Sequence, residues 1–183
     1  MSLFRLQRLA AAVTSGAVVA CPAESVWGLS CDPFNGAAVL ELLRLKSRKP
    51  SKGLIVTAGD IETVEPLLTV LSEAERAAVR LSWPGANTWL LPNQGVFPEW
   101  ITGASEEVAI RVTSSPTLAA LCRLSGGFLV STSANPAGAQ PAMTRFQVIN
   151  YFGPDLPVAA GSVDLSGKPS TIRRVGTGDV IRA

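Results

Sequence analysis

The segment FLVSTSAN, residues 128–135, sets a short apolar run directly before a row of small polar side chains. Residues 128–131 have the length and apolar character of a buried strand. The side chains of Ser131–Asn135 then offer three hydroxyl groups and an amide. Because open α/β sheets bind ligands beyond the carboxyl ends of strands, this segment predicts a turn that grips a phosphate or a ribose. An ordinary Ser/Asn-rich turn is the alternative when the motif is taken alone.

Similar short apolar runs recur on both sides of this segment. They predict strands at residues 17–21, 54–56, 88–91 and 108–112. Apolar residues at helical spacing and capping boxes predict helices at about 3–15, 37–45, 73–82, from 116, and 144–152. Residues 170–175 and 179–182 read as a hairpin, a short helix follows a cap at Asp60, and residues 92–105 read as a long loop.

Helices and strands therefore interleave along the whole chain, which indicates an α/β fold with a helix-flanked, largely parallel or mixed sheet. The chain has 183 residues, a length that fits one domain with a substantial core. Repeats, linkers and low-complexity tracts are absent from the sequence. We therefore expect one domain over residues 1–183.

Composition narrows the class of protein further. Hydrophobic residues make up 47% and charged residues 16% of the chain, as in a compact globular protein. No apolar run approaches the roughly 18 residues of a membrane span, and the first residues lack the pattern of an export signal. We expect a cytoplasmic protein without membrane attachment, in which Cys21, Cys31 and Cys122 are reduced and mostly buried.

The chain contains no histidine. Ser-His-Asp and Cys-His catalysis and His-ligated metal sites are therefore excluded, and the cysteines match no common zinc spacing. Any chemistry must rest on the positioning of substrates and on positive charge, with Mg²⁺ as a candidate helper. The net charge of +2 is too small to indicate a nucleic-acid binder by itself.

Positive charge is concentrated in one run, which comprises Arg44, Lys46, Arg48, Lys49 and Lys52. Cations at the end of a helix are favoured by the helix dipole, which is one explanation. Five cations in nine residues also repel one another unless an anion lies among them. A triphosphate would meet that need, since Arg offers a planar fork and Lys a mobile point charge.

Two further segments carry polar residues beside predicted strands. Glu24, in residues 22–29, could bind an ammonium group or a metal, whereas Trp27 is better suited to the core. Residues 168–172 place small hydroxyl groups at the start of a late strand. The sequence has no Walker-type phosphate-binding loop.

Taken together, seven segments carry a family resemblance. They are PAESVWGL (22–29), LKSR (45–48), KGLIV (52–56), WPG (83–85), VAIRV (108–112), STSAN (131–135) and PSTI (169–172). In this order and spacing they closely resemble the YrdC/TsaC family of threonylcarbamoyl-AMP synthases, in its short bacterial form. The resemblance covers about residues 5–182 and implies a twisted mixed sheet with a basic concave face.

The resemblance implies a nucleotidyltransferase that converts L-threonine, bicarbonate and ATP into L-threonylcarbamoyladenylate and pyrophosphate. The product serves modification of the adenosine beside the anticodon in tRNAs that read ANN codons. Mg²⁺ would be bound through the ATP phosphates and not by a protein metal site. Expected partners are downstream proteins that transfer the threonylcarbamoyl group and, weakly, tRNA itself.

The resemblance also implies roles for individual residues. Lys46 and Arg48 would be catalytic; Lys46, Arg48, Lys52, Ser131, Ser133, Asn135, Pro141 and Arg182 would contact ATP; Ala23, Thr57, Arg111 and Ser170 would contact threonine. Arg111 suits the threonine carboxylate. The sequence departs from the family at Ala23, where Thr is usual, and at Lys49, which stands between Arg48 and Pro50.

Two other functions fit parts of the sequence. A non-catalytic module that binds double-stranded RNA or tRNA would use the same cations, but it gives the Ser/Asn segment and Arg111 no obvious purpose. A related carbamoyl-adenylate enzyme of metallocentre maturation is expected within a much longer chain with zinc-binding cysteines. An assay for threonine-dependent release of pyrophosphate distinguishes these two functions from a threonylcarbamoyl-AMP synthase.

Overall fold

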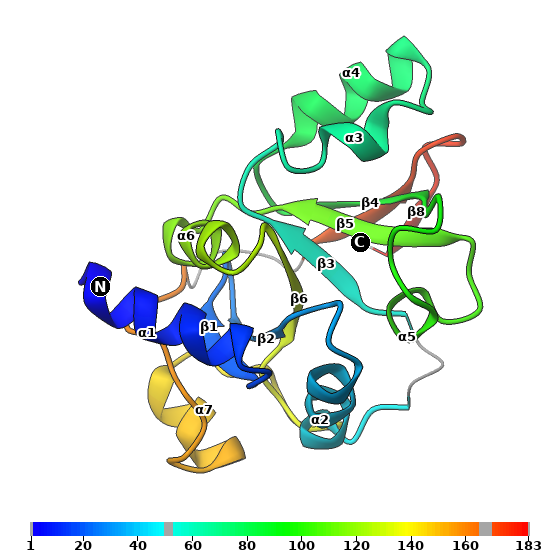
Figure 1. Ribbon diagram of the computed structural model, residues 1–183. Helices are drawn as coiled ribbons and strands as arrows, with labels where there is room; N and C mark the ends of the chain where they lie inside the picture. The colour runs from blue at the N-terminus through cyan, green and yellow to red at the C-terminus, as the bar shows by residue number, and fades with distance from the viewer. Residues whose placement is uncertain (1, 50–52, 165–169, 183) are drawn as a thin grey trace.

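The computed structural model describes residues 2–49, 53–164 and 170–182. Within them, eight strands form one twisted sheet in the order β1-β2-β6-β3-β5-β4-β7-β8, with seven helices around it (Figure 1). The strands are β1 (Val19–Pro22), β2 (Trp27–Cys31), β3 (Ile55–Ala58), β4 (Asn87–Pro92), β5 (Glu107–Val112), β6 (Phe128–Ser133), β7 (Thr171–Arg174) and β8 (Val180–Arg182). The helices are α1 (Leu3–Thr14), α2 (Gly36–Lys46), α3 (Glu65–Leu68), α4 (Glu73–Ser82), α5 (Glu99–Thr102), α6 (Pro116–Leu124) and α7 (Arg145–Phe152).

The predicted mixed sheet is confirmed. Only the β3–β5 and β4–β7 pairs are parallel, and the other pairs of these strands are antiparallel. The alternative of a largely parallel sheet is wrong, because β1–β2 and β7–β8 are hairpins and β6 runs antiparallel to both of its neighbours.

Each face of the sheet has its own apolar layer, because successive side chains of a strand point to opposite faces. On one face, Val56 and Val130 belong to the larger core cluster, together with Leu42 of α2. On the other face, Leu129 packs with Leu9 of α1 and with other residues of α1 and α6. Helices α1 and α6 lie together beside β1 (Figure 1).

Strand register places a cavity on this second face. Thr57 pairs with Leu129 of β6, so Ile55, two residues earlier in β3, points to the same side as Leu129. Ile55 in turn pairs with Ala109 of β5, and Ala109 with Leu90 of β4. These three residues line an open cavity. The face that α1 and α6 cover at one end is therefore accessible at the other.

Most predicted helices form where their caps indicated. Both capping boxes, Ser72 with Glu75 and Thr144 with Gln147, are present at the starts of α4 and α7. Asp60 accepts a hydrogen bond from the Thr63 backbone N–H at 3.1 Å, but it caps a turn that precedes α3 and not the helix itself.

Two local predictions are wrong. The sequence predicts no strand between residues 21 and 54, but β2 begins at Trp27 and pairs directly with β1. Trp27 is fully buried, as predicted. Residues 92–105, expected to be a long loop, contain the short helix α5. Ile101 of this helix is buried, and its backbone O accepts a hydrogen bond from the Leu54 N–H at 2.8 Å. Two buried apolar side chains, Phe97 and Ile101, therefore pack this segment against the core.

The three cysteines are free and buried, as predicted. Burial raises the pKa of Cys31 and Cys122 to about 12, and it raises the pKa of Cys21 further above its usual value. All three are therefore neutral thiols at physiological pH, and a buried thiol is a poor nucleophile. Among the described residues, no helix has the length and apolarity needed to cross a membrane.

Close packing of α6 on the end of β3 leads to a stability prediction. A Cβ atom at Gly59 would lie 2.5 Å from the backbone O of Ala119 in α6. We expect Gly59→Ala to destabilise the fold by about 1–3 kcal/mol, because the helix must shift to admit the methyl group. Gly176→Ala is the control, since its Cβ would meet nothing nearer than 3.9 Å. Urea unfolding followed by circular dichroism measures both, and equal stability of the two variants would contradict the packing.

Candidate functional site

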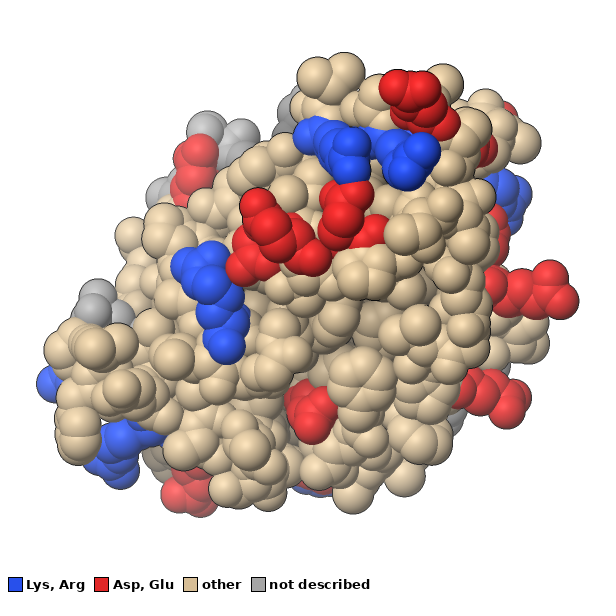
Figure 2. Space-filling model, turned by 45° about the horizontal axis from the view of Figure 1, so that its top comes forward, with Lys and Arg blue, Asp and Glu red and all other residues tan. Residues whose placement is uncertain are grey.

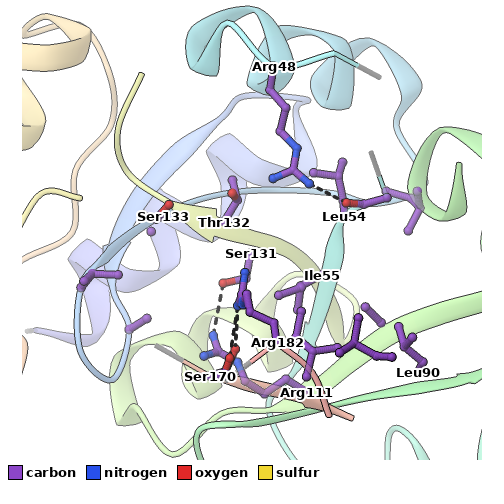
Figure 3. A pocket seen from close by; sticks show the side chains of 18 of the residues that line it. Arg48, Leu54, Ile55, Leu90, Arg111, Ser131, Thr132, Ser133, Ser170 and Arg182 are labelled. Atoms are coloured by element: carbon purple, nitrogen blue, oxygen red, sulfur yellow. Dashed lines mark hydrogen bonds between the residues drawn. The ribbon is translucent and has the colours of Figure 1, made fainter. Parts of the chain in front are cut away.

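The cavity has a volume of about 580 Å³ and lies over β6, β3, β5, β4 and the ends of β7 and β8. Figure 3 shows Arg48 on one side of it and Arg111, Arg182 and Ser170 on the other, with Ser131–Ser133 between them. The predicted site residues that line it are Ala23, Arg48, Arg111, Ser131, Ser133, Pro141, Ser170 and Arg182. Eight of the proposed contacts, from segments far apart in the sequence, therefore meet at one place.

A second hollow of about 430 Å³ adjoins this cavity. Lys46, Lys49 and Asn135 line it, together with Arg48 and Ser133, which line the first cavity as well. The two hollows thus share a wall, and a ligand longer than either could extend from one to the other.

Lys46 ends helix α2 and is only 6% exposed. Its Nζ donates to the backbone O of Ser133, to the backbone O of Asn135 at 3.0 Å and to Asn135 Oδ1 at 3.5 Å. The backbone O of Lys46 accepts from the Ala137 N–H at 2.9 Å. The end of α2 is therefore joined to the segment after β6 through both the main chain and the side chain of one residue.

Directly after Lys46, a residue in the left-handed backbone conformation ends α2, and the chain turns toward the cavity. Ser47 has φ 51°, and the backbone N–H groups of Ser47 and Arg48 donate to the last turn of α2. Arg48 then reaches across, and its Nη2 donates to the backbone O of Gly53 at 2.7 Å. Arg44, one turn earlier, is exposed and paired with Glu41 at 2.6 Å. Arg44 therefore does not belong to the site, although the sequence grouped it with the other cations.

Like charges affect one another across the two hollows. Burial, followed by the charge of Arg182, lowers the pKa of Arg48. Burial, followed by the charge of Arg48, lowers the pKa of Lys46 to about 8. A ligand with several negative charges would relieve both effects. Phosphate groups suit such a site because Arg can donate to two phosphate oxygens at once.

The far wall is formed by polar side chains in two hydrogen-bonded groups, from β4, β5, β6, β8 and the residue before β7. Arg182 Nη2 donates to the backbone O of Ser170 at 3.2 Å, and Thr88 Oγ1 donates to Ser170 Oγ at 3.1 Å. Arg111 Nη2 donates to Ser131 Oγ at 3.3 Å. Arg182 Nη2 also lies 3.5 Å from Ser170 Oγ. The hydroxyl groups of Ser131 and Ser170 therefore each contact an arginine that lines the same cavity.

Arg111 already has a carboxylate partner within the chain. Its Nη1 lies 2.8 Å from Glu24 Oε2, while Glu24 Oε1 accepts from Thr113 Oγ1 at 2.7 Å and from the Ser114 N–H at 3.0 Å. Glu24 was considered from the sequence only as a ligand for an ammonium group or a metal. Its actual partners are nearly 90 residues away in sequence, so no local pattern could reveal them.

Four predicted positions differ in part from expectation or lie outside the described residues. Thr57 is fully buried in β3 and does not line either hollow, and its Oγ1 has no hydrogen-bond partner among the described residues. Lys52 lies outside the described residues. Ser131 and Ser133 belong to β6 itself and not to a loop beyond it, so the cavity lies on the face of the sheet and not at its carboxyl edge.

Residues 2–49, 53–164 and 170–182 contain no group of three His, Cys, Asp or Glu residues that could hold a metal ion. Both carboxylates of the cavity lining, Glu24 and Glu107, are paired with arginines, Arg111 and Arg174 respectively. Among the described residues, this cavity is therefore lined by arginines and by no cluster of unpaired carboxylates.

These features define a mixed-sheet α/β protein with a basic cavity that can hold an extended anion. A family model described as telomere recombination, Sua5/YciO/YrdC, matches residues 11–183. The chain therefore belongs to the Sua5/YciO/YrdC family, and the resemblance found in its sequence is confirmed.

Curated relatives match the whole length of the chain. A threonylcarbamoyl-AMP synthase from Pseudomonas aeruginosa (strain UCBPP-PA14) is 48% identical over 184 residues, which cover 100% of this chain and 98% of the relative. A threonylcarbamoyl-AMP synthase from Cellvibrio japonicus is 45% identical over 179 residues, which cover 97% of this chain and 95% of the relative.

Solved structures share the fold. P. abyssi Sua5 in complex with L-threonine has a TM-score of 0.89 and 25% identity, and the match covers 100% of this chain and 54% of that one. This chain thus spans about half the length of that Sua5 protein. E. coli YciO, with a TM-score of 0.81, 18% identity and coverage of 97% of this chain and 87% of that one, agrees in fold.

The lowered pKa of Lys46 predicts a dependence of stability on pH. The unfolded chain holds this proton up to a pH near the ordinary value of 10.5, whereas the folded chain releases it near 8. Between these values the unfolded state binds more protons, so the Lys46 contribution to the free energy of unfolding rises with pH. We expect urea unfolding from about pH 7 to pH 10.5 to show this rise in the unmodified protein, relative to Lys46→Met.

Lys49→Met is the matched control, since Lys49 is an exposed neighbour in the same turn. Its stability should follow pH as the unmodified protein does. Parallel curves for the unmodified protein and Lys46→Met would show that Lys46 keeps its ordinary pKa.

Proposed function

We propose that this chain is a threonylcarbamoyl-AMP synthase, which joins L-threonine, bicarbonate and ATP into L-threonylcarbamoyladenylate and releases pyrophosphate. The observation that carries the proposal is the gathering of Lys46, Arg48 and Arg182 around two adjoining hollows, in a chain whose relatives of similar length are threonylcarbamoyl-AMP synthases. P. abyssi Sua5, which shares the fold, has been solved with L-threonine.

The reaction suits a cavity without histidine or a free thiolate. The threonine amine adds to the carbon of CO₂ with loss of a proton, or to bicarbonate with loss of water, and gives a carbamate. A carbamate oxygen then attacks the α-phosphorus of ATP, and the bond to the β-phosphate breaks so that pyrophosphate leaves. The enzyme supplies no nucleophile, and it accelerates the reaction by aligning the reactants and by stabilising charge that develops on the phosphates. Fixed cations in a partly buried cavity serve that purpose.

In this proposal the triphosphate extends across both hollows. Arg48 lines both of them and would contact the phosphates that link the two. Lys46, in the second hollow, would meet the departing pyrophosphate with Asn135 and with Lys52 nearby in sequence. Ser131, Ser133, Pro141 and Arg182 would hold the nucleoside part. Mg²⁺ would enter with ATP, bound by phosphate oxygens, and share in the neutralisation of their charge.

Threonine would occupy the end of the cavity near Ala23, Arg111 and Ser170. Arg111 is 8% exposed, and its Nε has no hydrogen-bond partner among the described residues. A buried donor without a partner is costly, so a substrate carboxylate that reaches it would bind favourably. Thr57 pairs with Arg111 across β3 and β5 and is fully buried. In this proposal it packs beside Arg111 and does not touch the substrate.

Contact with tRNA is a separate proposal, and we infer that it is weak. The net charge of the chain is +2, and on the face drawn in Figure 2 acidic and basic side chains lie close to one another. Proteins that depend on phosphate contacts bind nucleic acid in a strongly salt-dependent way. The adenylate would then pass to proteins that act on tRNA in the cytoplasm. A purely RNA-binding module is a weaker candidate, since it assigns no purpose to the cavity over the sheet.

The proposal predicts a substrate requirement. Purified protein should release pyrophosphate from ATP only when threonine, bicarbonate and Mg²⁺ are all present, because the attacking oxygen belongs to the carbamate formed from threonine. A coupled pyrophosphate assay with single omissions measures this, and mass spectrometry identifies the adenylate. Equal turnover without threonine would contradict the proposal.

A second prediction concerns Arg48. Its replacement by Ala should reduce kcat/KM by an amount equivalent to roughly 2–4 kcal/mol, the scale of losing one preorganised donor. Arg48→Lys should restore only part of the loss, because a point charge cannot donate to two phosphate oxygens in a plane.

Arg44→Ala is the matched control, since Arg44 lies in the same basic run but is exposed and paired with Glu41. It should keep the kinetics of the unmodified protein. If the Arg48 variants fold and keep unchanged kinetics, Arg48 does not contact the phosphates, and its charge serves only to stabilise the end of α2.

A further inference from the structure

The turn between β1 and β2 is tied to the rest of the cavity by one carboxylate. Residues 23–26 form this turn, and the backbone N–H of Ala23 donates to the Val26 O at 3.1 Å. Ala23, Ser25 and Val26 all line the cavity. Glu24 lies among them, but its side chain leaves the turn and joins Arg111 of β5, Thr113 and Ser114.

Both oxygens of the Glu24 carboxylate are engaged in different ways. Oε1 accepts from Thr113 Oγ1 at 2.7 Å and from the Ser114 N–H at 3.0 Å, which fixes the carboxylate on the segment between β5 and α6. Oε2 lies 2.8 Å from Arg111 Nη1, and both side chains are largely buried, at 10% and 13% exposure. A buried pair of this kind holds its partners rigidly, because separation would leave an uncompensated charge.

The restraint that Glu24 places on Arg111 also reaches Ser131 of β6, on the far side of β3. With Nη1 held by Glu24, Arg111 Nη2 donates to Ser131 Oγ at 3.3 Å and Nε remains without a partner among the described residues. The orientation of the guanidinium group, and therefore the place where its free donor lies, depends on Glu24. The formation of the adenylate itself does not require a carboxylate at this position.

We propose that Glu24 is a positioning residue for the amino-acid substrate: it fixes the plane of Arg111 and, through the same carboxylate, the turn at residues 23–26. The inference rests on the proposed function, since it takes threonine as the ligand beside Arg111. Glu24 does not touch the substrate in this account. It sets the affinity for threonine and leaves the phosphate-binding side of the cavity, around Lys46 and Arg48, unaffected.

The test uses three variants of the full chain. Glu24→Gln removes the charge, Glu24→Asp keeps it on a side chain one methylene shorter, and Thr113→Val removes one donor to Oε1 without changing the size of the side chain. Glu41→Gln is the control, since it makes the same chemical change in an exposed pair with Arg44. Steady-state assays at a temperature well below each Tm give separate KM values for threonine and ATP.

We expect Glu24→Gln to raise the KM for threonine by roughly tenfold to a hundredfold, the scale of a lost hydrogen bond to a charged group. Glu24→Asp should raise it less, and Thr113→Val least. The KM for ATP should change by no more than about twofold, as should both KM values in Glu41→Gln. Isothermal titration of the unmodified protein and each variant with threonine, in the presence of a non-hydrolysable ATP analogue, should give the same order.

A merely structural role would give a different pattern. If Glu24→Asp and Thr113→Val lower the Tm but leave the KM for threonine unchanged, or raise both KM values equally, the inference is overturned while the proposed function stands. This holds even if Glu24→Gln does not fold. If the unmodified protein shows no threonine-dependent turnover and no threonine binding, the inference and the proposed function both fail.

Discussion

The burial of one ammonium group at the end of α2 is the constraint on which the candidate site depends. Lys46 is 6% exposed and, among the described residues, its Nζ donates to oxygen atoms of Ser133 and Asn135. This arrangement brings the basic run after α2 to the polar residues at the end of β6, which lie more than 80 residues later in the sequence. Burial also destabilises the charge, so the place where the two segments meet favours an anion.

The sheet provides the second element of the site, which is an exposed part of an otherwise covered face. Side chains that alternate along β3, β5 and β6 give the sheet an apolar core on one face and a mixed surface on the other. Helices α1 and α6 cover one end of that mixed surface. Because β6 runs antiparallel to both neighbours, Ser131 lies opposite Ile55 at the start of β3 and Ser133 lies opposite Gly28 of β2, within the sheet and not beyond its edge.

The basic character of the cavity comes from the pairing of its carboxylates with arginines and not from a large excess of cations in the chain. Glu24 and Glu107 are both in its lining, but each is bound to an arginine, so neither opposes the binding of a phosphate as a free carboxylate would. The remaining cations, Lys46, Arg48 and Arg182, hold hydrogen bonds to neutral oxygen atoms. A chain with a net charge of only +2 can therefore present a strongly basic cavity.

The sequence by itself determined most of the helices and strands and several caps, because capping boxes such as Ser72 with Glu75 and apolar periodicity act over a few residues. It also identified eight residues of the cavity lining through the family resemblance. Only the tertiary structure decided that β2 pairs with β1 and β6, that Arg44 lies apart from Arg48, and that Arg111 is bound to Glu24. These outcomes depend on strand pairing and on contacts between residues far apart in the chain. Their free energy comes from burial and from the pairing of charges in the folded state, and no local pattern of residues encodes it.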